Sequence, residues 1–161
     1  MITAYIAIGS NQGDPVAQAK CAINALQQLP NTQVTAVSSL YSSTPMGPQD
    51  QPDYINAVVE IKTQLEPLSL LDLTQEIELN QGRVRKDERW GPRTLDLDLI
   101  LFGNTVLDSE RLTIPHYGMK VREFVLYPLA EIAPSLTLPD GTELASLLQQ
   151  VDKNGLTIWQ A

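Results

Sequence analysis

Hydrophobic and polar positions along the chain follow two different periods, and the changes between these periods predict the elements. Four β-prone apolar stretches are typical of strands, at residues 4–8, 34–41, 54–62 and 94–102. Apolar side chains recur at helical spacing over residues 16–29 and 70–77. Asp14-Pro15 and Glu66-Pro67 are favourable helix starts for these two segments.

The predicted order is β-α-β-β-α-β, which is typical of an α+β fold with a ferredoxin-like core. In that core an antiparallel sheet carries its helices on one face. Residues 44–52 hold three prolines and a glycine and are expected to form a loop. The rest of the chain predicts a hairpin partner near Val106 and helices over 122–127 and 142–149, which could cover the open face of the sheet. We expect residues 1–161 to form a single domain.

The clearest chemical signal is the pair of aspartates in the last predicted strand. Alternate side chains of a strand share a face, so Leu95, Leu97, Leu99 and Leu101 are expected to face the core. Asp96 and Asp98 then project together from the other face, with Cα atoms roughly 6.5 Å apart. Two carboxylates at this spacing suit one Mg²⁺ ion or a pair of them, with further ligands from substrate phosphates. The alternative is a solvated strand face with two ordinary aspartates.

A basic segment leads directly into this strand. Residues 83–93 hold five of the chain's eleven lysines and arginines: Arg83, Arg85, Lys86, Arg89 and Arg93. Arginine is well suited to bidentate contacts with phosphate oxygens. A basic run alone is commonly a solvated loop, but beside two carboxylates it predicts phosphoryl-transfer chemistry. Residues 9–13 lack the lysine of a P-loop, so any nucleotide enzyme here is not of that class.

Other single residues carry weaker signals. His116 is the only histidine and lies near Arg111, Lys120 and Arg122, where it could contact phosphate. Tyr54, Asn56 and Phe124 are candidates for holding a flat heterocycle by stacking and amide pairing. For Tyr54 and Phe124 the alternative is core packing, and for Asn56 it is an ordinary hydrogen-bonded position in a strand. For His116 the alternative is a structural or simply exposed residue.

Composition narrows the classes of function. The net charge of −8 and the sequence pI of about 4.5 argue against general nucleic-acid binding, which needs a basic face. Cys21 is the only cysteine, so no disulfide forms within the chain. No apolar run approaches the roughly 20 residues of a transmembrane helix, and the N-terminus lacks a basic signal-peptide region. We expect a cytoplasmic protein that does not bind membranes, and a monomer.

The run from Arg89 to Ile100, RWGPRTLDLDLI, resembles the signature of the 6-hydroxymethyl-7,8-dihydropterin pyrophosphokinases. Residues 7–11, 47–57, 114–117 and 122–129 resemble other motifs of that family, in register over nearly the whole chain. The likeness is greatest to the enterobacterial type. It implies pyrophosphate transfer from MgATP to the pterin hydroxymethyl group in folate synthesis, with release of AMP.

The resemblance also implies a role for each site residue. Two Mg²⁺ ions would be bound by Asp96 and Asp98, while Arg83 and Arg93 would stabilise the transferring phosphates. The ATP site would comprise Glu78, Arg85, Arg93, Leu99 (through its backbone, toward adenine), Arg111, Thr113, His116, Tyr117 and Arg122. The pterin site would comprise Ser43, Thr44, Met46, Tyr54, Asn56, Trp90, Asp96 and Phe124.

Two other functions remain open at this point. Another Mg-dependent nucleotidyl or phosphoryl transferase would share the aspartate pair but accept a different substrate. A non-catalytic nucleotide or pterin module would bind ligand without producing AMP.

Overall fold

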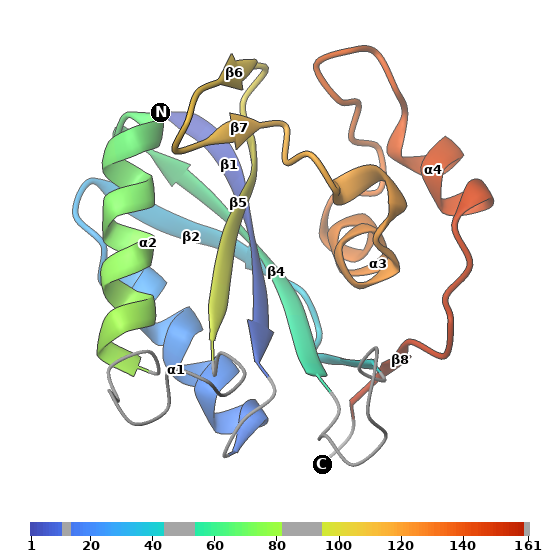
Figure 1. Cartoon of the computed structure of the whole chain (residues 1–161), viewed down its shortest axis with the longest axis horizontal. Helices are drawn as coiled ribbons and strands as arrows, with labels where there is room; N and C mark the ends of the chain where they lie inside the picture. Colours follow the sequence, from blue (N-terminus) through green and yellow to red (C-terminus); the bar gives the residue numbers. More distant parts are fainter. Residues whose placement is uncertain (11–13, 44–53, 82–94, 160–161) are drawn as a thin grey trace.

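The structure of the protein, a computed structural model, describes residues 1–10, 14–43, 54–81 and 95–159 (Figure 1). The predicted loop over 44–52 and the basic segment over 83–93 lie outside the described residues.

An antiparallel sheet forms the centre of the molecule. The central strand β1 (Ile2–Ser10) pairs with β4 (Tyr54–Thr63) on one side and with β5 (Asp96–Phe102) on the other. β4 also pairs with β2 (Thr32–Val37) and β3 (Tyr41–Ser43), and the order runs β5-β1-β4-β3-β8, with β8 at Thr157–Ile158. The aspartate strand β5 is therefore an edge strand of the described sheet.

Helices cover both faces of this sheet (Figure 1). On one face lie α1 (Pro15–Gln27) and α2 (Pro67–Gln81), over a core that includes Ile6, Ile8 and Leu26. On the other face lie α3 (Glu123–Ile132) and α4 (Leu144–Gln150), over a second core that includes Val58 and Ile100. The prediction that the C-terminal helices cover the open face is confirmed.

A β-bulge in β5 corrects the predicted alternation of its leucines. Leu99 pairs with Ile6 and Leu101 with Tyr5, so Ile100 is an extra residue between two consecutive pairs. The extra residue reverses the alternation beyond it. Leu97 and Leu99 pack in the α1–α2 core as predicted, but Leu101 packs in the α3–α4 core.

The predicted strand over 34–41 is broken into β2 and β3. Ser38 causes the break, because its hydroxyl oxygen accepts the Val58 N–H at 2.9 Å while its own N–H donates to the Val58 carbonyl at 2.9 Å. Ser38 thus uses both backbone groups of Val58, and the chain passes through residues 39 and 40 before pairing resumes at Tyr41.

The hairpin partner predicted near Val106 does not pair with β5. Instead β6 (Leu107–Asp108) and β7 (Thr113–Ile114) form a separate two-stranded sheet. The turn after β5 uses Gly103 at φ +55°, whose N–H donates to the Thr3 carbonyl and directs the chain away from the edge. A short 3-10 helix, Met119–Val121, precedes α3. None of the helices in the described ranges has the length and apolar character that a membrane crossing requires.

Asp14 caps α1 as the sequence predicts, since its side chain accepts the Ala17 N–H at 3.1 Å and Pro15 follows it. We expect Asp14→Ala to lower the free energy of unfolding by about 1 kcal/mol through loss of this cap. Urea denaturation measures the change. Asp152→Ala, at an exposed position outside the helices, is the control and should change stability little; equal losses in both variants would contradict a capping role.

Candidate active site

The two aspartates lie where the sequence places them. Asp98 pairs with Ala7 and Asp96 with Gly9, and both side chains are half-buried on the α3 side of β5. Between them Leu97 points the other way and is only 3% exposed. Because Leu97 anchors the strand in the core, the carboxylates are held on one face beside one another.

A pocket of about 410 Å³ opens beside these carboxylates. It lies between β5, α2 and the segment from β6 to His116. Eight of the predicted site residues line it, namely Glu78, Asp96, Asp98, Leu99, Arg111, Thr113, His116 and Tyr117. The structure therefore gathers most of the predicted nucleotide residues and both predicted metal ligands in one hollow.

Glu78 fixes the outer edge of β5. The residue is only 6% exposed, and its carboxylate accepts the Leu97 backbone N–H at 2.7 Å. An edge strand leaves such N–H groups without a neighbouring strand, and this charged acceptor satisfies one of them. Glu78 thereby sets the position of the aspartate strand against α2.

His116 joins the pocket through three contacts. Its backbone N–H donates to the Ile100 carbonyl at 3.0 Å, and its Nδ1 accepts the Gly118 N–H at 3.1 Å. The neutral imidazole therefore carries its proton on Nε2. The ring stacks on Tyr117 with centroids 4.7 Å apart, and the Arg122 guanidinium lies 5.5 Å from the Tyr117 centroid.

Burial and two neighbouring charges together determine the direction of the His116 pKa shift. Burial lowers the pKa of its imidazole below 6.5, the Asp98 carboxylate raises this pKa, and the Arg122 guanidinium lowers it. The net shift is downward, so the neutral form predominates at pH 7. As a neutral ring, His116 offers a hydrogen-bond donor without placing a second cation beside Arg122.

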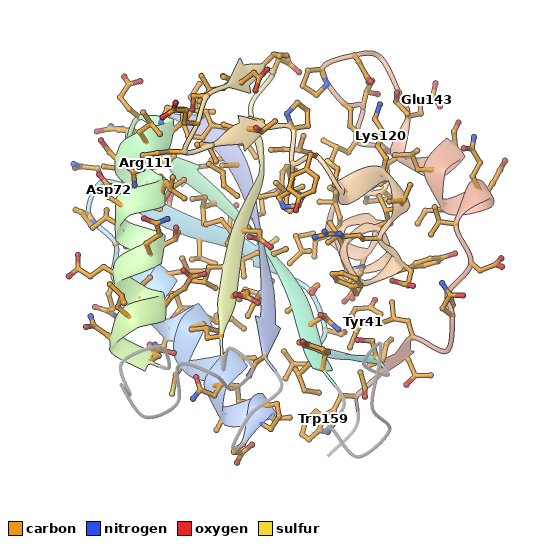
Figure 2. All side chains as sticks on the ribbon, in the orientation of Figure 1. Tyr41, Asp72, Arg111, Lys120, Glu143 and Trp159 are labelled. Atoms are coloured by element: carbon orange, nitrogen blue, oxygen red, sulfur yellow. The ribbon has the colours of Figure 1, made fainter. Side chains whose placement is uncertain are left out.

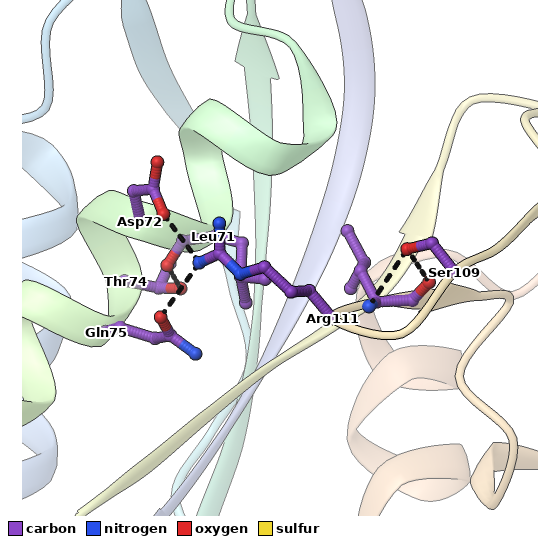
Figure 3. A network of polar contacts seen from close by, with 7 residues as sticks. Leu71, Asp72, Thr74, Gln75, Ser109 and Arg111 are labelled. Atoms are coloured by element: carbon purple, nitrogen blue, oxygen red, sulfur yellow. Dashed lines mark hydrogen bonds and ion pairs between the residues drawn. The ribbon is translucent and has the colours of Figure 1, made fainter.

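Arg111 reaches from the β6–β7 connection to α2 (Figure 3). Its guanidinium bonds to the Asp72 carboxylate at 2.6 Å and to the Gln75 amide oxygen at 3.1 Å. The Arg111 and Asp72 side chains are 49% and 62% exposed, so this ion pair contributes roughly 0–1 kcal/mol.

Of the predicted pterin residues that the structure describes, Asp96 lines the pocket, whereas Ser43, Tyr54, Asn56 and Phe124 are not part of its lining. Asn56 pairs across β1 with the same Gly9 that pairs with Asp96, so Asn56 and Asp96 belong to one row of the sheet. The Asn56 Nδ2 donates to Ser43 Oγ at 2.8 Å. Tyr54 and Phe124 are half-buried, and the Arg122 guanidinium lies 5.8 Å from the Phe124 centroid. Arg122 thus lies near a predicted residue of each substrate.

Comparison with known proteins places the chain in a family. The family model described as 7,8-dihydro-6-hydroxymethylpterin-pyrophosphokinase (HPPK) matches residues 5–134. A Haemophilus influenzae protein named 2-amino-4-hydroxy-6-hydroxymethyldihydropteridine pyrophosphokinase is 57% identical over 93% of this chain and 93% of its own length. A Pseudomonas aeruginosa protein of the same name is 55% identical over 94% of this chain and 93% of its own length. The chain belongs to the HPPK family.

Solved structures agree on the fold. A Plasmodium falciparum HPPK-DHPS structure superposes with a TM-score of 0.70 over 93% of this chain at 14% identity. Another HPPK-DHPS, solved in complex with substrates, gives 0.71 over 93% at 12% identity. This chain spans 43% and 45% of those two longer chains.

Six of the predicted HPPK site residues lie outside the described part of the chain: Thr44, Met46, Arg83, Arg85, Trp90 and Arg93. Sequence reasoning also missed residues that line the pocket, which are Leu71, Gln75, Leu97, Glu110 and Leu112. Residues 71, 75 and 78 follow helical spacing along α2, so the face that carries Glu78 was readable from its period. No comparable periodicity marks the pocket residues of the β6–β7 segment.

The donor set fits Mg²⁺. No group of three or more His, Cys, Asp or Glu side chains that could hold a metal occurs within the described ranges. Two adjacent carboxylates in an open pocket suit Mg²⁺, which keeps water and takes phosphate oxygens rather than a full protein cage.

The single histidine makes the pocket's electrostatics measurable. In the ligand-free protein we expect the imidazole resonance to titrate with a midpoint below 6.5, because burial disfavours the charged ring. The imidazole pKa is lower in the folded protein than in the unfolded chain. Its contribution to the free energy of unfolding is therefore fully present at pH values above the unfolded-state pKa, and it is lost as the pH falls through the folded-state pKa. NMR titration measures the imidazole midpoint in each protein. Compared with wild type, Asp98→Asn should have a lower midpoint and Arg122→Gln a higher one. The opposite order would contradict the placement of these charges.

Proposed function

We propose that this protein transfers the pyrophosphoryl group of MgATP to the hydroxymethyl group of 6-hydroxymethyl-7,8-dihydropterin, with Asp96 and Asp98 at the transferring phosphates. As a member of the HPPK family, the protein is an enzyme, a pyrophosphokinase of folate biosynthesis. The observation that carries the residue assignment is the convergence of both carboxylates with Arg111 and His116 on one pocket.

The nucleotide is proposed to lie along the edge of β5. Leu97 directs its N–H outward to Glu78, and alternate residues of a strand direct their backbone groups to the same edge. The backbone N–H and C=O of Leu99 therefore face this edge too. Its backbone groups are suited to pair with adenine. Arg111, Thr113, His116, Tyr117 and Arg122 are proposed to contact the ribose and phosphates. Arg85, which lies outside the described residues, completes this proposed set.

The pterin is proposed to lie on the other side of the aspartates, next to the row that contains Asn56. An amide presents a donor and an acceptor together, which matches the edge of a pterin ring. Tyr54 and Phe124 are proposed to stack on its faces, with Ser43 and Asp96 at its edge. Thr44, Met46 and Trp90, outside the described residues, are proposed to close this pocket.

The chemical step brings the hydroxymethyl oxygen to the β-phosphorus of ATP and releases AMP. Asp96 and Asp98 would hold Mg²⁺, for which we propose two ions, and the bound metal supplies charge neutralisation on the phosphate oxygens. His116 and Arg122 are proposed to hold the polyphosphate from the opposite wall. Arg83 and Arg93 are proposed to stabilise the charge that develops during transfer.

Four further expectations remain proposals. The order β5-β1-β4-β2 of the first four long strands, with both crossover helices on one face, supports a ferredoxin-like core. We propose that residues 1–161 act as one pyrophosphokinase domain. A monomeric state and a cytoplasmic location stay predictions.

Asp98→Asn should lower turnover at least a hundredfold, because it removes a negative charge where the metal binds while keeping the side chain's shape. Steady-state assays with MgATP and the pterin measure this loss, and circular dichroism checks the fold. Asp152→Asn, an exposed change outside the pocket, is the matched control. Near-normal turnover of Asp98→Asn would remove this residue from the reaction.

Product analysis separates the proposed chemistry from its alternatives. Wild-type protein with MgATP should release AMP and give a pterin heavier by two phosphates, as resolved by chromatography and mass spectrometry. ADP with a pterin monophosphate would retain a kinase but exclude pyrophosphoryl transfer. Binding of both substrates without any product would favour a binding module.

A further inference from the structure

Three hydrogen-bond donors from the β2–β3 connection converge on one carboxylate of α3. Glu131 accepts the Ser39 backbone N–H at 3.0 and 3.1 Å, the Ser39 hydroxyl at 2.9 Å and the Tyr41 hydroxyl at 2.7 Å. These residues are about ninety positions apart in sequence, so the bonds join α3 to the strand region that carries β3. Figure 2 shows Tyr41 near the β8 end of the sheet, away from Arg111 and Asp72 at α2.

The break after β2 creates the need for this acceptor. Ser38 uses both backbone groups of Val58, so the next N–H along the chain, that of Ser39, has no β4 partner and bonds to Glu131 instead. Tyr41 is 9% exposed, and its hydroxyl finds in Glu131 the acceptor that a largely buried hydroxyl requires. Burial and this carboxylate raise the pKa of Tyr41 above its ordinary value, which keeps the hydroxyl a donor.

The same strand region sets the orientation of Asn56. Tyr41 is the direct cross-strand partner of Asn56, and Ser43, two residues later, accepts the Asn56 Nδ2 hydrogen at 2.8 Å. Asn56 is 4% exposed, so its amide has little freedom to rotate once that bond is made. The bond directs one N–H toward β3 and thereby decides which way the amide oxygen points.

We propose that Glu131 is a positioning residue for pterin binding. It holds Tyr41 and Ser39, these fix β3, and β3 orients the Asn56 amide through Ser43. The proposal rests on the assignment of Asn56 to the pterin, made under the proposed function. Glu131 itself touches no substrate in this account.

The chain contains a matched control for a purely structural effect. Glu60 accepts the Tyr5 hydroxyl at 2.7 Å and the Thr35 hydroxyl at 2.8 Å, and Tyr5 is 6% exposed. This second tyrosine–glutamate contact lies in the same sheet, but Glu60 is four residues along β4 from Asn56, about 13 Å away. Glu60→Gln and Tyr5→Phe therefore weaken a comparable contact at a distance from the pterin residues.

The test measures binding separately from turnover. Fluorescence titration with 6-hydroxymethyl-7,8-dihydropterin, in the presence of Mg²⁺ and a non-reactive ATP analogue, gives a dissociation constant for wild type, Glu131→Gln, Tyr41→Phe, Glu60→Gln and Tyr5→Phe. We expect Glu131→Gln to raise the pterin Kd roughly tenfold, because the three donors must then share one amide oxygen. We expect Tyr41→Phe to raise the pterin Kd several-fold, because it removes only the Tyr41 hydroxyl contact. The Kd of the ATP analogue should stay unchanged. The double variant Glu131→Gln/Tyr41→Phe should bind pterin no worse than Glu131→Gln alone.

The comparison between the two pairs decides the proposal. Similar losses of thermal stability in all four variants, with weaker pterin binding only in the Glu131 and Tyr41 variants, would support positioning. Equal changes in pterin Kd at both pairs, or none at Glu131, would overturn it.

An Asn56→Ala variant separates this inference from the proposed function. If Asn56→Ala weakens pterin binding and Glu131→Gln does not, the inference fails while the pterin assignment stands. If Asn56→Ala binds pterin normally, the assignment of Asn56 fails and the inference fails with it, whereas release of AMP by wild type would still support the proposed reaction.

Discussion

Two like charges held side by side on an edge strand are the constraint on which the site depends. Asp96 and Asp98 are half-buried on one face of β5, and like charges at this spacing repel one another. The core holds them there despite this cost, because Leu97 and Leu99 are anchored on the opposite face. A strand without these anchors could turn its carboxylates toward water. His116 lines the pocket beside these carboxylates, and its imidazole interacts electrostatically with Asp98 and with Arg122.

The same sheet joins the two halves of the site. Gly9 on β1 pairs with Asp96 on one side and with Asn56 on the other, so a single row runs from a proposed metal ligand to a proposed pterin residue. Gly9 adds no side chain to this row, and a Cβ there would lie 3.7 Å from the Asn56 Oδ1. The distance between the backbones of Asp96 and Asn56 is therefore set by strand spacing, which is about 4.8 Å per strand, rather than by loops. Phe124 lies in the first turn of α3 and Arg122 directly precedes this helix, so both come from the face of the sheet that α3 covers.

The sequence predicted those features that depend on local period and spacing. The aspartate pair follows from alternation along one strand, and the α1 cap follows from Asp14-Pro15 at the head of a helical repeat. Features that depend on a single residue's tertiary partner were not readable. The insertion of Ile100 and the loss of pairing at Ser38 each shift a strand by one residue, and neither residue is unusual for a strand. The contact of Arg111 with α2, thirty-nine residues earlier, has no local signal either. The basic segment, a strong part of the sequence argument, lies outside the described residues.

Two carboxylate contacts on α2 differ in how easily a nucleotide could replace them. Arg111 and Asp72 are both well exposed, so their ion pair is weak and a phosphate can take the place of Asp72 at little cost. Glu78 instead accepts a buried backbone N–H, and breaking that bond would leave a donor on β5 without a partner. Entry of ATP should therefore redirect Arg111 while leaving the Glu78 contact, and with it the aspartate strand, in place. The site thus combines a replaceable cation contact with a fixed strand, which suits a reaction that depends on holding phosphates in a set geometry.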